Sequence, residues 1–243
     1  MTFPLPEGLP AGRLVPDGSP VMWQSDEPPA DPLAEWTRYQ RQQGDTGLMP
    51  VLCYPNRRSD SPDLAAVDAV DLEGDLEEGW RGYPKHRLAG DGPGARFDRW
   101  PGLARGTLAS CGVDPDEAAR SAFALLADEW PYELWDGCLG LVAARRSADI
   151  PALVGWRAEA PLPVLCALLR SWEDRFGARV LAAVGSTLYV SVASPPRDEQ
   201  QAQHVALEHL LTTADNIVDD PPTPFPEYAA SLVDAPLWRF WWD

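Results

Sequence analysis

Lysine is nearly absent from this sequence of 243 residues, in which Lys85 is the only one. The 37 acidic side chains outnumber the 20 basic ones, which gives a formal net charge of −17 at pH 7. Binding to nucleic acid depends on Lys and Arg that displace counterions from phosphates, so we expect no binding to nucleic acid or to an anionic membrane. The charge favours a basic protein as a partner.

Long apolar segments are also missing. No stretch approaches the ~18 consecutive apolar residues of a membrane-spanning helix, and the opening MTFPLPEGLPAGRL lacks the basic and apolar regions of a signal peptide. The four cysteines, Cys53, Cys111, Cys138 and Cys166, are widely spaced and never form a CxxC pair. These features predict reduced thiols in a cytoplasmic protein.

Common catalytic motifs are absent as well. The sequence has no GxxxxGK[ST], GxSxG or HExxH motif, and no GxGxxG after a predicted strand. His204 and Glu208 would share the polar face of a predicted helix, with His209 at the flank of its apolar stripe. Zinc needs a third protein ligand, so we expect structural histidines, no metal and no cofactor.

Aromatic residues, in contrast, are abundant. The chain has eleven tryptophans, and three of them fall in the closing octet PLWRFWWD. Each aromatic side chain can bury about 150–250 Å², so we expect a substantial core. Strand alternation places Trp238, Phe240 and Trp242 on one face of this octet, and Arg239 and Trp241 on the other. The C-terminal strand is therefore predicted to be an integral part of the core.

The sequence suggests three regions. Residues 1–30 are rich in proline and are predicted to form an extended arm. Residues 31–137 are predicted to form an N-terminal α/β region with an irregular acidic insert that contains the run DLEGDLEEG (71–79). Residues 138–243 are predicted to form a C-terminal α+β domain. Most of the excess negative charge lies in the first 137 residues, which hold 24 acidic and 12 basic side chains.

Helical periodicity, caps and alternating apolar residues give the expected elements. Helices are predicted at 31–44, 114–130, 161–177, 197–214 and 225–233, and strands at 46–54, 138–144, 178–184, 187–193 and 236–243. The helix at 114–130 begins with Asp114 as its cap, and the helix at 161–177 ends at Gly177. Gly185-Ser186 joins the strands 178–184 and 187–193 as a hairpin turn. This order predicts an α+β fold with a mostly antiparallel sheet and helices packed on one face.

The C-terminal segments RSWEDRFGARV, TLYVSVASPP, EHLLTTADNI, EYAASLV and WRFWWD resemble a bacterial family, domain-of-unknown-function family 4253. This resemblance covers about the last hundred residues, from Arg170 to the end. The upstream segment TGLMPVLCY is similar to the N-terminal region of the actinobacterial members. The resemblance implies a domain boundary, and it implies no particular activity.

Six polar or aromatic residues are candidates for a ligand site: Glu173, Arg175, Asp215, Asn216, Arg239 and Trp241. Asp215 and Asn216 close the predicted helix 197–214 and would present a carboxylate and an amide to a substrate. A capping turn is the alternative for this pair, because Asn tolerates the left-handed conformation.

For the other four candidates, a structural role is the alternative to ligand binding. Glu173 and Arg175 would line a pocket at the end of their helix, or belong to a solvated face. Arg239 beside Trp241 would form a stacking platform for a ligand. Arg239 would otherwise pair with a helix carboxylate while Trp241 covers a half-buried face.

Two functions remain open from the sequence. The first is a non-enzymatic, cytoplasmic interaction protein whose acidic surface meets a basic partner, with an accessory or toxin-neutralising role by analogy. The alternative is a small-molecule-binding protein or enzyme with a polar cleft near Asp215 and Asn216. The strong negative charge without catalytic motifs favours the first.

Overall fold

The computed structural model describes residues 3–16, 19–54, 64–84, 92–156, 161–212, 217 and 223–242 of the chain. Its strands are β1 (Gly12–Val15), β2 (Met22–Ser25), β3 (Met49–Cys53), β4 (Cys138–Val142), β5 (Ala178–Val184), β6 (Thr187–Val192) and β7 (Leu237–Trp241). They form one seven-stranded sheet in the order β1-β2-β4-β3-β5-β6-β7. Only β3 and β5 among these neighbours run parallel, which confirms the predicted α+β fold with a mostly antiparallel sheet.

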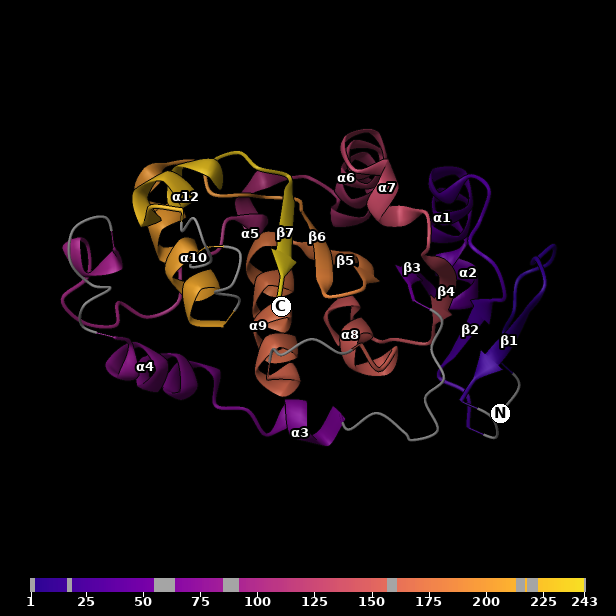
Figure 1. Cartoon of the computed structure of the whole chain (residues 1–243), viewed down its shortest axis with the longest axis horizontal. Coiled ribbons are helices and arrows are strands. Elements are labelled where there is room, and N and C mark those ends of the chain that lie inside the picture. The colour runs from indigo at the N-terminus through magenta and orange to yellow at the C-terminus, as the bar shows by residue number, and fades with distance from the viewer. Residues whose placement is uncertain are drawn as a thin grey trace.

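Helices surround this sheet (Figure 1). They are α1 (Pro32–Arg41), α2 (Gln43–Thr46), α3 (Leu64–Asp68), α4 (Leu72–Gly82), α5 (Leu108–Cys111), α6 (Pro115–Glu129), α7 (Pro131–Leu134), α8 (Ile150–Leu153), α9 (Leu162–Phe176), α10 (Glu199–Thr212) and α12 (Phe225–Ser231), with 3-10 turns η2 (Pro93–Ala95) and η3 (Ser147–Asp149). Strands β1 and β2 lie at one end of the molecule, and α10 and α12 lie at the other (Figure 1).

The helices of the C-terminal half cover one face of the sheet, as the sequence predicts. Leu169 of α9, Val205 of α10 and Phe225 of α12 belong to the same apolar cluster as Val180 and Val190 of the strands. This cluster is the larger part of the core.

The opposite face is also covered, by helices from the N-terminal region, whereas the sequence predicts helices on one face alone. Trp36 of α1 and Phe123 of α6 stack with ring centroids 4.6 Å apart, and both pack against Leu141 and Leu181 of the strands. The reason is that the central strands carry apolar side chains on both faces, so that every residue of β4 is buried.

Strand β7 is packed into the sheet by its pairing with β6, which confirms its predicted role in the core. Its inward side chains Trp238 and Phe240 surround Trp172 of α9, with ring centroids 5.3 Å and 5.6 Å from the indole. All three rings are buried. The strand is the last in the sheet order, so its stability comes from these side chains and from pairing along one edge.

The proline-rich N-terminal segment contributes two strands to the same sheet. β1 pairs with β2, and β2 pairs in turn with β4, where Trp23 lies opposite Leu141. All four residues of β2 are buried. The segment therefore adds an edge to the sheet that the C-terminal half completes.

The acidic run at 71–79 is helical, and the expectation of an irregular insert is wrong for these residues. Asp71 caps α4, and its side chain accepts a hydrogen bond from the amide of Gly74. Leu76 and Trp80 are buried one turn apart, so they anchor the helix while its carboxylates face solvent. Acidic residues at the start of a helix also interact favourably with its dipole.

Candidate functional site

A polar cleft opens at the end of the sheet where β3 and β5 begin. Its inner part is a pocket of about 20 Å³, and its outer part is an open cleft of about 550 Å³. The residues that line both parts are Gln40, Gln43, Met49 and Asp116. The inner pocket has room for one water-sized group, and the outer cleft lies within the range of small-ligand sites.

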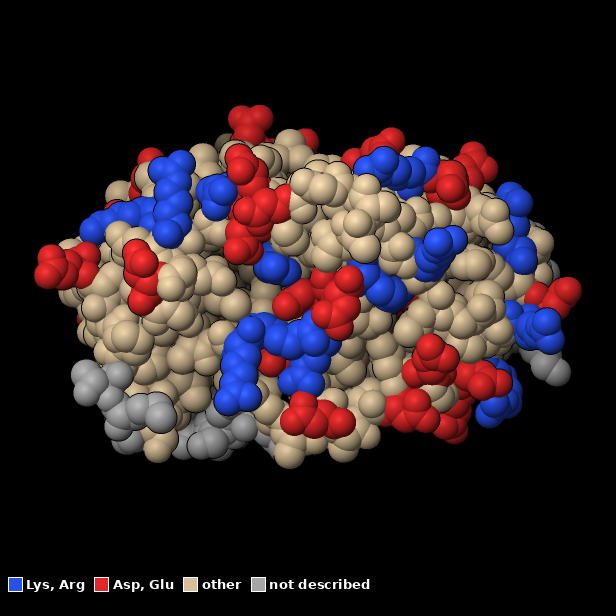
Figure 2. Space-filling model, turned by 180° about the vertical axis from the view of Figure 1, so that it is seen from behind, with Lys and Arg blue, Asp and Glu red and all other residues tan. Residues whose placement is uncertain are grey.

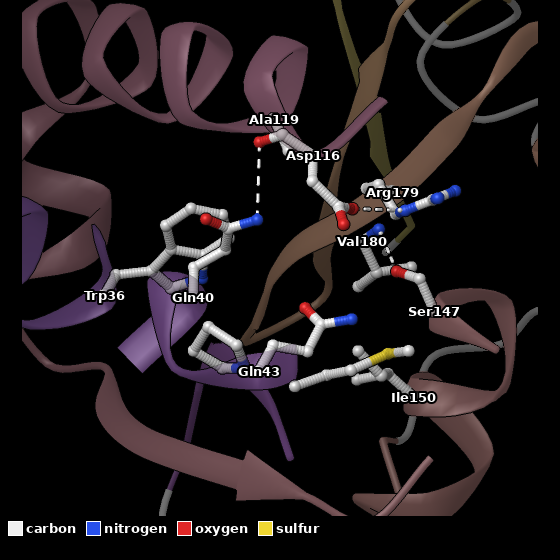
Figure 3. A pocket seen from close by; sticks show the side chains of 11 residues that line it. Trp36, Gln40, Gln43, Asp116, Ala119, Ser147, Ile150, Arg179 and Val180 are labelled. Carbon is white, nitrogen blue, oxygen red and sulfur yellow. Dashed lines mark hydrogen bonds and ion pairs between the residues drawn. The ribbon is translucent and has the colours of Figure 1, made fainter. Parts of the chain in front are cut away.

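Figure 3 shows side chains around the inner pocket from α1, α2, β3, α6, η3, α8 and β5. The lining residues are Trp36, Gln40, Gln43, Met49, Pro50, Asp116, Ala119, Ser147, Ile150, Arg179 and Val180. The site is therefore assembled from segments that lie far apart in the sequence.

Asp116 is the acidic group of the inner pocket. It lies in the first turn of α6, where its amide donates to the side chain of the capping residue Asp114. Its Oδ1 accepts a hydrogen bond of 3.0 Å from Nε of Arg179 at the start of β5 (Figure 3). Its Oδ2 makes no hydrogen bond with the described residues, so it remains available to a ligand.

Gln40 connects α1 to α6 across the cleft. Its Oε1 accepts a hydrogen bond from Arg120, and its Nε2 lies 3.4 Å from the carbonyl oxygen of Asp116. Gln40 is buried, so this amide is held in one orientation by its partners. The neighbouring Gln43 makes no side-chain hydrogen bond within the described residues, and its amide also faces the pocket (Figure 3).

Trp36 forms part of the pocket wall and carries an unused donor. The side chain is only 2% exposed, and its Nε1 is buried without a hydrogen-bond partner in the part of the chain that the structure describes. A buried donor without an acceptor costs about 1–3 kcal/mol. A water molecule or a ligand acceptor in the pocket would remove this cost.

The ion pair of Arg179 continues into a wider network of charges. Its Nη1 lies 4.0 Å from Oε1 of Glu173, and that same oxygen lies 3.5 Å from Nε of Arg146. The second carboxylate oxygen of Glu173 accepts a hydrogen bond of 3.0 Å from the amide of Ala148. Glu173, a candidate from the sequence, thus supports Arg179 from behind and does not line the pocket itself.

Arg175, the second candidate on α9, points away from this network. Its guanidinium makes two hydrogen bonds with Glu208 of α10, of 2.9 Å and 2.7 Å, and a third with the carbonyl oxygen of Ala104. Glu208 also accepts from the indole of Trp172 at 2.7 Å and is 0% exposed. Glu173 and Arg175 therefore do not line one pocket, because Glu173 pairs with Arg179 and Arg175 pairs with Glu208.

Arg239 and Trp241 lie on the other face of the sheet from α9. Arg239 is opposite Tyr189 in the register of β6 and β7, and its Nε donates to the hydroxyl of Tyr189 at 3.3 Å. Tyr189 belongs to the apolar cluster on that second face. Asp215 and Asn216 lie outside the described residues. Of the four candidates that the structure describes, only Glu173 lies next to the cleft.

The interpretation of α10 as a helix with a polar face also needs correction. Glu208 is fully buried, because α10 packs against α4 and α12 and because Trp172 and Arg175 of α9 contact its carboxylate. His209 is fully buried as well, with its Nδ1 2.9 Å from the hydroxyl of Tyr228. Among the described residues, no group of three or more His, Cys, Asp or Glu side chains is arranged to hold a metal ion.

The cleft residues Trp36, Gln40, Asp116 and Arg179 were not predicted from the sequence. Asp116 was recognised only as part of a helix start, and nothing in the local pattern links it to a strand 63 residues later. No short motif contains these four residues, so only the contact between α1, α6 and β5 reveals them.

The start of β4 marks a boundary in the comparison with known proteins. Residues 138–243 match the family model described as Domain of unknown function (DUF4253). The DUF4253 segment supplies Ser147, Arg179 and Val180 to the inner pocket, whereas Trp36 and Asp116 come from the region before it. The cleft therefore lies between the DUF4253 segment and the N-terminal region, a common position for ligand sites.

The chain was also compared with curated proteins and with solved structures. No curated protein and no solved structure matches it. Within the described residues, no helix combines the length and the apolar character needed to cross a bilayer.

Proposed function

We propose that the protein binds a small zwitterionic molecule, with an amino acid as the simplest example, in the cleft between α1–α2 and α6. The observation that carries this proposal is the buried, unpartnered Nε1 of Trp36 in the wall of a pocket that also contains the Asp116 carboxylate. A buried donor and an available acceptor in one pocket favour a ligand with hydrogen-bonding groups of both kinds.

The outer cleft adds charges of both signs. Its lining includes Asp114, Asp116 and Glu117 together with Arg41 and Arg120. A purely anionic ligand would be repelled by the carboxylates, and a purely cationic one by the guanidinium groups. A molecule that carries both an ammonium and a carboxylate group fits this arrangement better than either.

Two residues are the proposed charge partners of the ligand. Oδ2 of Asp116 would accept from the ammonium group. Arg41 would bind the carboxylate, since its guanidinium makes no ion pair or hydrogen bond with another described residue although it lines the cleft. The amide of Gln43 would provide an additional hydrogen bond.

A screen of single amino acids by thermal shift, followed by calorimetry, tests this proposal. A ligand that binds the native state raises the melting temperature, because it adds ~2.7 kcal/mol to the free energy of unfolding at a concentration of 100 times its Kd. We expect Arg41→Gln and Gln43→Ala to weaken the binding of the best ligand at least tenfold and about threefold, because each removes a direct contact.

Gln200→Ala is the matched control, because Gln200 is an exposed glutamine on α10. This variant should bind like the wild type. The proposal is wrong if no amino acid shifts the melting temperature, or if Arg41→Gln binds the ligand as tightly as the wild type does.

We also propose a cytoplasmic location in a bacterial cell, in agreement with the sequence-based expectation. Support comes from the cysteines, because Cys53, Cys111, Cys138 and Cys166 are all free thiols.

We propose binding to a basic partner protein as a second function, and the net charge of −17 supports it. Figure 2 shows acidic and basic side chains intermingled on the face drawn there, so whole-surface attraction alone does not define a docking site.

A further inference from the structure

Two exposed aromatic side chains project from the segment that joins α6 to β4. Tyr132 is 73% exposed and Trp135 is 59% exposed. Their ring centroids lie 4.4 Å apart, with the planes inclined by 66°. All eleven tryptophans lie within the described residues, and Trp135 is the only one of them that is exposed.

The backbone beneath these rings is fixed. Leu134, between the two aromatic residues, is 1% exposed and packs in the core. A Cβ added at Gly137 would lie 3.2 Å from the carbonyl oxygen of Leu134 and 3.2 Å from the side chain of Val184, so the turn into β4 is closely packed. The two rings are thus presented on an anchored turn, which lowers the entropy lost when a partner binds.

Carboxylates flank the aromatic pair. Asp128 and Glu129 end α6, Asp136 follows Trp135 directly, and all three are exposed. None of them forms an ion pair with another described residue. Exposed aromatic rings next to uncompensated negative charge match a positively charged side chain with a flat, weakly hydrated head.

We propose that this surface, formed by Tyr132, Trp135, Asp128, Glu129 and Asp136, docks an arginine-containing basic segment of a partner protein. A guanidinium group would stack on Trp135 or Tyr132 while it pairs with the carboxylates. Arginine suits this site better than lysine, because its planar group combines stacking with bidentate hydrogen bonds. Trp, Tyr and Arg are also the residues that dominate binding energy at protein interfaces.

This surface is independent of the ligand cleft. Cys138 pairs with Cys53 at the end of β3, whereas Val142 pairs with Met49 at its beginning. The aromatic pair precedes Cys138, and Met49 lines the cleft, so the two sites lie at opposite ends of the sheet. A variant at one site should therefore leave binding at the other unchanged.

Fluorescence anisotropy with a labelled peptide of six arginines separated by glycine and serine tests the proposal. At 150 mM salt we expect saturable binding to the full-length protein, and binding at least fivefold weaker to Trp135→Ala. Trp135→Phe should retain part of the affinity, because it keeps a ring. A peptide with lysine at every arginine position should bind at least threefold more weakly than the arginine peptide.

Charge variants complete the design. Asp136→Asn should weaken peptide binding and reduce its salt dependence, whereas Asp45→Asn, the same change at an exposed carboxylate in α2, should have a smaller effect. The proposal fails if the peptide does not bind, if Trp135→Ala binds it like the wild type, or if the lysine peptide binds equally well. Binding of neutral lipid vesicles that is lost in Trp135→Ala would also overturn it, in favour of a membrane surface.

Discussion

At the scale of single residues, His209 shows how burial changes the chemistry of a side chain. It is 0% exposed, and its ring lies 4.8 Å from that of Trp172 and 4.6 Å from that of Trp238. Burial, with a smaller contribution from the charge of Arg175, lowers the pKa of His209 well below its ordinary value of about 6.5. The folded protein therefore keeps His209 neutral at pH values where the unfolded chain protonates it.

This difference predicts a pH-dependent loss of stability. Above pH ~6.5 His209 is neutral in both states, and below it only the unfolded state binds the proton, so the free energy of unfolding falls by up to ~1.4 kcal/mol per pH unit until the lowered pKa is reached. Urea unfolding between pH 5 and 8 should show this slope in the wild type and a smaller one in His209→Gln. Equal slopes in the two proteins would contradict the assignment.

At the scale of an element, the two faces of β7 make different contributions to stability. Trp238 is 2% exposed and packs against α9, whereas Trp241 is only half-buried on the opposite face. Trp238→Ala should lower the free energy of unfolding by ~3–5 kcal/mol, because it leaves a cavity among the packed rings. Trp241→Ala, the matched change on the same strand, should cost less than half as much in chemical denaturation. Similar losses would show that β7 is not packed as described.

The predictions that succeeded at this scale rest on local signals. The apolar face of α9 and its end at Gly177, where φ is +67°, follow from helical spacing and from the conformational freedom of glycine. The hairpin at Gly185 and the alternation in β7 are local in the same way. The α4 helix was missed because its three glycines and Asp75 have low helix propensity, and its stability depends on Leu76 and Trp80 reaching the core.

At the scale of the whole molecule, the sheet joins the two halves of the chain. β3 lies between β4 and β5, so the DUF4253 segment 138–243 does not form a continuous sheet by itself. Leu52 pairs with Leu139 on one side and with Ala182 on the other. Removal of the N-terminal region would leave unpaired strand edges and an uncovered apolar face.

The isolated segment 138–243 is therefore expected to lack a cooperative fold. Full-length protein should unfold in one calorimetric transition, whereas the fragment should show little dispersion in its amide NMR spectrum and should bind a hydrophobic dye. The intact chain measured under the same conditions is the control. A fragment with a sharp thermal transition and a dispersed spectrum would show that the C-terminal half folds without β3.

The ligand cleft belongs to this scale too, which explains why it escaped prediction. Its acidic group is in a helix cap and its basic partner, Arg179, is at a strand start, and each has an ordinary local role. Gln40 and Trp36 read as residues of an amphipathic helix. Their convergence depends on α1 and α6 packing over the same face of the sheet, a long-range contact that no local pattern contains.

The sequence by itself determined the mostly antiparallel α+β class, the C-terminal helices and strands, and the role of the final tryptophans in the core. These features depend on periodicity, helix caps and turn residues, which are patterns among residues close together in the sequence. Only the tertiary structure decided that helices cover both faces, that β3 separates β4 from β5, and that Asp116 meets Arg179. The physical reason is that these contacts join residues far apart in the chain, where the pairing with the lowest free energy depends on the whole core.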